Sequence, residues 1–127
     1  MDALEVLKTK LLKYPDLPNE QNEKSLSIMP EGGFTVSFHE NETGYTVGYE
    51  GWHEDFSNAD EALDCFAFGL SDQCRLEITQ RGGFAYKWTL QYRDGDNWVD
   101  DSTTGLFLFP FWRKKTVVYL RNNVIQG

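Results

Sequence analysis

The sequence has few of the residues that catalytic and metal sites use most often. Its only histidines are His39 and His53, its only cysteines are Cys65 and Cys74, and none of these has the spacing of zinc ligands. No serine or cysteine stands in a nucleophile signature, and no glycine-rich segment matches a phosphate-binding loop. We therefore expect no cofactor and no metal, and an enzyme is the least favoured class of function.

Positive charge is missing from a long internal stretch. Between Ser25 and Cys74 there is no Lys or Arg, whereas ten Asp and Glu residues lie there. Residues 1–64 carry fourteen acids against four lysines, and residues 65–127 carry six acids against eight bases, so the net charge of −8 resides in the first half. This excludes nucleic acid as a partner of that half and favours a basic protein partner.

Long apolar runs are also absent. No stretch approaches the roughly 18 apolar residues of a membrane span, and charges interrupt the first thirteen residues where a secretory signal would have its apolar core. We expect a cytoplasmic protein with no membrane partner. The cysteines are expected to be free thiols, although the sequence leaves a disulfide open. A chain of 127 residues with 40% hydrophobic content predicts one domain, residues 1–127.

Two segments show helical periodicity. Asp2 and Glu5 have the spacing of a capping box, and apolar residues then recur at helical intervals. The second helix begins at Ser57 or Asn58, since both are good N-caps. We expect Gly69 to end it, because glycine readily adopts the left-handed conformation of a C-terminal cap.

The most regular strand pattern covers residues 84–93. Large apolar side chains alternate there with smaller or polar ones, which predicts a central strand with one buried face formed by Phe84, Tyr86, Trp88, Leu90 and Tyr92. Shorter alternations predict strands near residues 26–30, 34–39, 45–49 and 76–78. Residues 52–55 are predicted to be an acidic loop.

The last part of the chain predicts a hairpin of residues 106–112 and 116–120 that is apolar on both faces. Burial on two sides requires cover on two sides, so we expect a pocket, a partner or a homodimer there. A basic rim, residues 113–115, lies beside it. The candidate residues for self-association or for a pocket wall are Phe107, Phe109, Phe111 and Trp112.

The predicted partner site lies in the acidic half, between the third strand and the second helix. A strongly negative surface raises the rate of encounter with a basic partner. Tryptophan is enriched in binding hot spots, which makes Trp52 the candidate apolar anchor. The candidate partner-binding residues are Glu40, Glu42, Glu50, Trp52, Glu54 and Asp55.

A shift of 50 residues aligns two parts of the chain. Gly32 and Gly33 fall on Gly82 and Gly83, and apolar residues around them also match. This pattern suggests two tandem units, each a helix followed by a hairpin. The predicted fold is α+β, with a curved, mostly antiparallel sheet of about seven strands and two helices on one face.

The order of these elements in a small acidic chain resembles that of bacterial secretion chaperones, and small acidic immunity proteins are similar in size and charge. The terminal hairpin departs from the chaperone pattern. The resemblance implies a chaperone-like or immunity-like binding protein, which agrees with a non-catalytic protein that engages a basic partner. The alternative is a small-molecule-binding module whose pocket is walled by the terminal hairpin.

Overall fold

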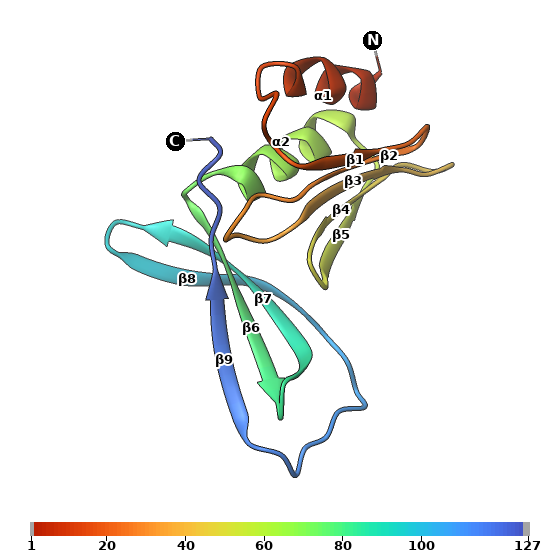
Figure 1. The fold of residues 1–127 in the computed structure, drawn as a ribbon. Helices are drawn as coiled ribbons and strands as arrows, with labels where there is room; N and C mark the ends of the chain where they lie inside the picture. Colours follow the sequence, from red (N-terminus) through yellow and green to blue (C-terminus); the bar gives the residue numbers. More distant parts are fainter. Residues whose placement is uncertain (1, 126–127) are drawn as a thin grey trace.

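The computed structural model describes residues 2–125, which form two helices and nine strands in two antiparallel sheets (Figure 1). The α+β prediction is confirmed, whereas a single curved sheet of about seven strands is wrong. The elements are α1 (Ala3–Leu11), β1 (Asn19–Gln21), β2 (Ser25–Ile28), β3 (Val36–Glu40), β4 (Tyr45–Tyr49), β5 (Trp52–Phe56), α2 (Ala59–Leu70), β6 (Cys74–Arg81), β7 (Phe84–Asp94), β8 (Asn97–Gly105) and β9 (Lys115–Leu120).

The first sheet is a meander in the order β1-β2-β3-β4-β5, and both helices lie on one of its faces (Figure 1). Its inner face is apolar because alternate strand residues point toward the helices, among them Leu26, Val36, Phe38 and Val47, all buried. Helix α1 packs on α2 and on β2. The prediction of two helices on one face therefore holds for this sheet.

Both helices begin where the sequence predicts. The Asp2 side chain accepts a hydrogen bond from the Glu5 amide at 2.9 Å, and the Asn58 side chain accepts one from the Glu61 amide at 3.0 Å. Each carboxylate or amide oxygen satisfies a backbone donor that has no partner within the helix. Asn58, rather than Ser57, is thus the N-cap of α2.

Gly69 does not end α2. The helix continues to Leu70, and Ser71 caps it in an extended conformation. The ring of Tyr49 lies so close that a Cβ on Gly69 would be 2.3 Å from Tyr49 Cε1. The prediction of a left-handed cap is wrong, and glycine is required here because a strand side chain packs directly on the helix backbone.

Two strands of the first sheet, β1 and β5, are not among the strands that the sequence predicts. Strand β5 pairs with β4 through a tight turn, with Tyr49 opposite Trp52, and its middle residues are polar and exposed. Strand β1 is exposed throughout and pairs with β2 at the other edge. Both are edge strands, where the backbone ladder rather than an apolar pattern determines the structure.

The second sheet has the order β8-β7-β6-β9 and extends away from the helices (Figure 1). Strand β7 is central, as predicted, but its apolar stripe is not buried along its whole length. A register shift leaves Tyr86 unpaired between Ala85 and Lys87, and Phe84 and Tyr92 at the two ends are exposed. Of the predicted stripe, Trp88 and Leu90 pack in the core cluster, whereas the ends of the sheet project beyond it.

The predicted terminal hairpin is wrong. Strand β9 confirms the strand predicted at residues 116–120, but it pairs with β6, and residues 106–112 form a loop. Strand β6 would otherwise present an unpaired edge, whereas the segment before β9 contains Pro110, which has no amide hydrogen for a ladder. Residues 106–112, the apolar segment predicted to be the first strand of the hairpin, are therefore a loop.

The two glycine pairs lie in hairpins of different register. In the first, Ile28 pairs with Val36 across a long connection, whereas in the second Ile78 pairs with Trp88, and Gly82 and Gly83 form a two-residue turn. A shift of 50 residues would require Ile78 to pair with Tyr86 instead. The duplication hypothesis is therefore wrong.

The segment after β9 is held in the core by Asn122. This buried side chain accepts a hydrogen bond from the Phe34 amide at 3.0 Å, and its Nδ2 donates to the carbonyls of Phe34 and Gly69 at 3.0 Å each. It thus connects the segment before β3, the end of α2 and the segment after β9. Three buried backbone groups depend on this one amide for their partner.

We predict that Asn122→Ala lowers the free energy of unfolding by about 3 kcal/mol, because it leaves buried backbone donors and acceptors without partners. The exposed neighbour Asn123 is the matched control, and Asn123→Ala should change stability by less than about 0.5 kcal/mol. Urea unfolding of both variants measures this. Equal, small effects would mean that water replaces the amide.

Candidate functional site

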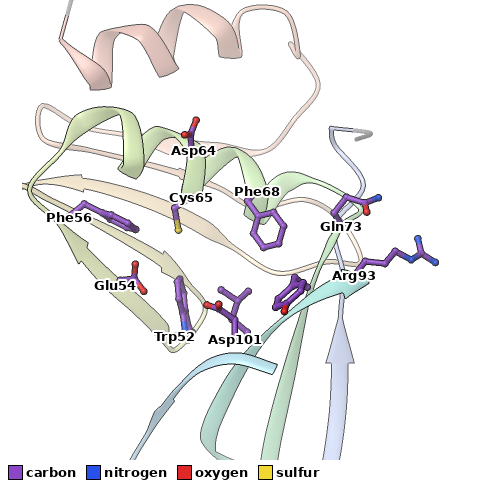
Figure 2. A pocket seen from close by; sticks show the side chains of 11 residues that line it. Trp52, Glu54, Phe56, Asp64, Cys65, Phe68, Gln73, Arg93 and Asp101 are labelled. Atoms are coloured by element: carbon purple, nitrogen blue, oxygen red, sulfur yellow. The ribbon is translucent and has the colours of Figure 1, made fainter. Parts of the chain in front are cut away.

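A pocket of about 480 Å³ lies where the first sheet, α2 and the second sheet meet (Figure 2). Its walls are largely aromatic and apolar, and carboxylates lie around them. The lining residues are Trp52, Glu54, Phe56, Asp64, Cys65, Phe68, Gln73, Leu90, Tyr92, Arg93 and Asp101. They come from β5, α2, the α2–β6 connection, β7 and β8, so the pocket exists only in the folded chain.

Trp52 forms a wall of this pocket rather than an exposed anchor. Only 2% of its surface is exposed, its ring stacks on Tyr49 with 4.6 Å between centroids, and its Nε1 donates to Ser102 Oγ at 2.9 Å. Next to it, Gly51 leaves room for the Trp88 ring, which would lie 2.3 Å from an added Cβ. The expectation that Trp52 is available to a partner is therefore wrong, because it joins the two sheets.

Glu54 points into the pocket because of its strand register. It pairs with Val47, whose side chain faces the core, so both lie on the inner face of the first sheet. Strand β5 is the edge strand of the first sheet, and Glu54 stays exposed to solvent there. The next residue, Asp55, points to the outer face, where it accepts a hydrogen bond from the Thr46 hydroxyl at 2.6 Å.

A β-bulge places the second carboxylate. Leu90 pairs with Ser102 and Gln91 with Asp100, which leaves Asp101 as an extra residue of β8. Bulges re-aim side chains at sheet edges, and this one puts Asp101 on the lining of the pocket. Figure 2 shows Glu54 and Asp101 on either side of Trp52, whereas Arg93, the only base on the lining, extends away at the far end.

The Cys65 thiol points toward the part of the pocket where Glu54, Trp52 and Asp101 lie (Figure 2). Burial raises the pKa of this thiol to about 11, the hydrogen bond with Tyr49 lowers it, and the negative charges of Glu54 and Asp101 raise it further. The Tyr49 hydroxyl donates to the Cys65 carbonyl and lies 3.2 Å from its sulfur. At neutral pH the thiol is therefore protonated and is not a thiolate nucleophile.

The structure does not bring the six predicted partner-binding residues into one patch. Glu40 and Glu42 lie at the β3–β4 turn, whereas Glu50 lies in the β4–β5 turn at the opposite end of the sheet. The Glu50 carboxylate also accepts a hydrogen bond from the Thr35 amide at 2.8 Å. Of the six, only Glu54 and Trp52 line the pocket.

Sequence reasoning missed Asp64 and Asp101 as lining residues. Asp64 stands in α2 near Cys65, and Asp101 follows Glu54 by almost fifty residues in the sequence. Asp64 lies in the predicted second helix, so its place on that helix could have suggested it as a lining residue. Asp101, in contrast, depends on a bulge that no local pattern signals. The pocket is therefore a property of the tertiary structure.

The candidate residues of the terminal segment lie elsewhere. Phe107, Phe111 and Trp112 are exposed, and Phe109 is half-buried against Tyr86. A second pocket of about 350 Å³ lies between α1, α2 and the C-terminal segment. Neither of the two pockets is lined by any of residues 106–120, so the predicted ligand pocket walled by this segment has no support in either of them.

Comparisons with family models, curated proteins and solved structures find no match for this chain. Within residues 2–125, no group of three or more His, Cys, Asp or Glu side chains is arranged to hold a metal ion. Over the same residues, no helix is long and apolar enough to span a membrane. A function can therefore be inferred only from the chemistry of the described residues, above all those of the pocket.

We predict that the chain loses stability as pH rises from 9 to about 11. The ordinary pKa of the Cys65 thiol is 9.0 and its folded value is about 11, so between these values the unfolded chain releases a proton that the folded chain retains. Stability present below pH 9 is thus lost as pH rises through the folded pKa. Burial also raises the pKa values of Tyr49 and Cys74, which adds to the effect.

Urea midpoints measured across this pH range for the unmodified chain and for Cys65→Ala test this prediction. The free energy of unfolding of the variant should decline less steeply with pH. The difference in slope corresponds to up to about one proton per chain. The slopes are compared rather than the absolute stabilities, because the substitution also removes packing. Parallel slopes would show that Cys65 ionises equally in both states.

Proposed function

We propose that this chain is a non-catalytic binding protein that engages a basic protein partner, and that the pocket receives a Lys or Arg side chain of that partner. The observation that carries the proposal is the combination of aromatic walls with the carboxylates of Glu54, Asp64 and Asp101 around one pocket. No base is close to Glu54 or Asp64 in sequence, since residues 26–73 contain no Lys or Arg.

The chemistry of the pocket suits a long cationic side chain. Its aromatic residues offer ring faces that attract cations, and its apolar surface suits the methylene stem of Lys or Arg. The carboxylates compensate the charged group at the end of the stem. Arg93, which Figure 2 shows pointing away, does not occupy that position.

The surrounding charges support a protein rather than a small cation. Bases that could neutralise the acidic half are engaged elsewhere: Arg75 donates to Gln91 at 2.8 Å and lies over the Trp98 and Tyr119 rings, and Arg81 donates to the Arg113 carbonyl. The remaining negative field extends over about 10 Å at 0.1 M salt, which steers a basic surface toward the pocket. A chaperone-like or immunity-like role fits such a field.

Binding is favoured over catalysis because Cys65 lacks a base. The pKa of its thiol is raised, and His39 and His53 lie on the outer face of the first sheet, opposite to Glu54 and the pocket. An activated thiol requires an adjacent histidine or another cationic group.

Adjacent residues on β5 allow a sharp test. Glu54 points into the pocket and Asp55 points to the outer face, so Glu54→Lys and Asp55→Lys make the same change of charge at neighbouring positions. We predict that Glu54→Lys weakens the binding of lysine-rich peptides at least about tenfold, whereas Asp55→Lys weakens it about twofold. Calorimetric titration of an oligolysine peptide into each variant measures the difference.

Salt provides a second measurement. The association rate should fall from low salt to about 1 M, where the field extends only about 3 Å, for the unmodified chain and for Asp55→Lys alike. If Glu54→Lys and Asp55→Lys weaken binding equally, the acidic half acts only as a diffuse field and the pocket is not the binding site. If oligolysine and oligoarginine peptides do not bind at low salt, the proposal fails.

A further inference from the structure

The loop between β8 and β9, residues 106–114, exposes an unusual amount of apolar surface. Phe107 is 100% exposed, Leu108 88%, Phe111 70% and Trp112 72%. Figure 1 shows this loop passing around the β6–β7 turn, at the end of the second sheet farthest from the helices. Large apolar side chains grouped on an exposed surface mark interaction sites, whereas isolated ones need no explanation.

The loop is held in place by contacts along its length. The Phe109 ring stacks on Tyr86 with 4.0 Å between centroids and 9° between planes, and the Leu106 amide donates to the Tyr86 carbonyl at 2.8 Å. At its other end the Gly82 amide donates to the Lys114 carbonyl at 3.0 Å. The backbone is therefore anchored while four apolar side chains are left outside.

Glycine at the β6–β7 turn contributes to this anchoring. Gly82 has a positive φ of 59°, and a Cβ at this position would lie 2.3 Å from Arg113 Cδ. The Arg113 side chain thus packs on the turn, and its carbonyl accepts a hydrogen bond from Arg81 Nη1 at 3.2 Å. The basic residues and the apolar residues of the loop are consequently fixed at the same end of the sheet.

The charge at this end is opposite to that of the first half of the chain. Residues 78–93 and 102–125 contain seven Lys and Arg and no Asp or Glu. Five of these bases come from the loop and from the parts of β6, β7 and β9 nearest to it: Arg81, Lys87, Arg113, Lys114 and Lys115.

We propose that this end of the second sheet binds the surface of an anionic phospholipid membrane. Phe107, Leu108, Phe111 and Trp112 enter the interface between headgroups and acyl chains, and the surrounding Lys and Arg contact the headgroups. Aromatic and leucine side chains beside basic residues are the combination that holds peripheral proteins on anionic leaflets. The absence of a membrane span from the sequence does not count against this mode of binding, because binding at the surface requires no span.

Two other occupants fit less well. A symmetric pair of copies joined through this end would bring two sets of five bases together, and like charges at an interface oppose association. Single-stranded nucleic acid requires aromatic faces along a basic groove, whereas neither described pocket is lined by this loop. A lipid surface, in contrast, needs no complementary shape and accepts exposed apolar side chains beside basic ones.

The orientation of the charges favours this mode of binding. The acidic half lies in the first sheet and the helices, away from the basic end (Figure 1). An anionic leaflet therefore attracts the loop and repels the rest of the chain, which presents the loop to the membrane first. The pocket of the first proposal stays on the part of the chain turned away from the lipid.

Vesicle sedimentation with the full chain tests the proposal. Vesicles of phosphatidylcholine with added phosphatidylserine should bind the chain at low salt, and binding should fall as salt rises. The triple variant Arg113→Gln/Lys114→Gln/Lys115→Gln should bind at least about tenfold more weakly, because each base near an anionic leaflet contributes about fivefold. Its matched control, Lys10→Gln/Lys13→Gln/Lys24→Gln, removes the same charge from the other end and should lose much less binding, about twofold at most.

Insertion of the loop has its own readout. Brominated lipids should quench the fluorescence of Trp112, and this quenching should be absent in Trp112→Phe, which still sediments with vesicles. Phe107→Ser/Leu108→Ser should lose most binding, whereas Leu12→Ser, an exposed apolar residue next to α1, should not. Circular dichroism confirms that each variant is folded.

Three results would overturn the proposal. The first is the absence of binding at low salt to vesicles that contain phosphatidylserine. The second is a concentration-dependent dimer in sedimentation that Phe107→Ser/Leu108→Ser abolishes, because the loop would then face a second copy. The third is tighter binding to single-stranded RNA than to anionic vesicles. None of these results bears on the pocket, which oligolysine titration tests separately.

Discussion

The contact between Trp52 and Ser102 is the constraint on which the arrangement of the two sheets depends. Strand β5 ends the first sheet and β8 ends the second, and the indole hydrogen bond joins these two edges while the ring stacks on Tyr49. Gly51 allows Trp88 of β7 to pack on the turn beside it. A single core consequently includes residues of both sheets. The pocket is the space left beside this joint, so the same side chain that connects the sheets also forms a wall of the candidate site.

One proposed surface is a pocket and the other is an exposed loop, because the core supports only part of the second sheet. Near the joint, Leu76 and Leu90 are buried, and side chains from α2 and β5 enclose a pocket. Farther out, β6, β7 and β9 have no helix over them, and Val117 and Val118 on β9 stay exposed. A sheet without a covering layer cannot bury its apolar residues within one chain. The exposed loop therefore continues a region that the fold itself leaves uncovered.

Local chemistry in the sequence predicted the helices and most strands, because N-caps and alternation act over a few residues. Asp2, Asn58 and the alternation of β3, β4 and β7 are examples. Strand β5 was missed because its middle residues are polar, and only its pairing with β4 makes it a strand. The pairing of β9 with β6, the separation into two sheets and the bulge at Tyr86 depend on contacts between distant residues. No alternation pattern contains that information.

The candidate site depends even more on contacts between distant residues, which local sequence patterns do not predict. Nearness in sequence grouped Glu54 with Asp55, but successive strand residues point to opposite faces, so the strand separates them. The bulge in β8 instead places Asp101 on the lining of the same pocket as Glu54. Charge is a different kind of property, because a stretch without bases stays acidic however it folds. What folding adds is direction: the acidic half forms the first sheet and most of its two helices, and five of the seven bases after Ile78 lie in or near one loop. A chain with charges separated in this way approaches any charged surface in one orientation, and this makes a different partner at each end physically consistent.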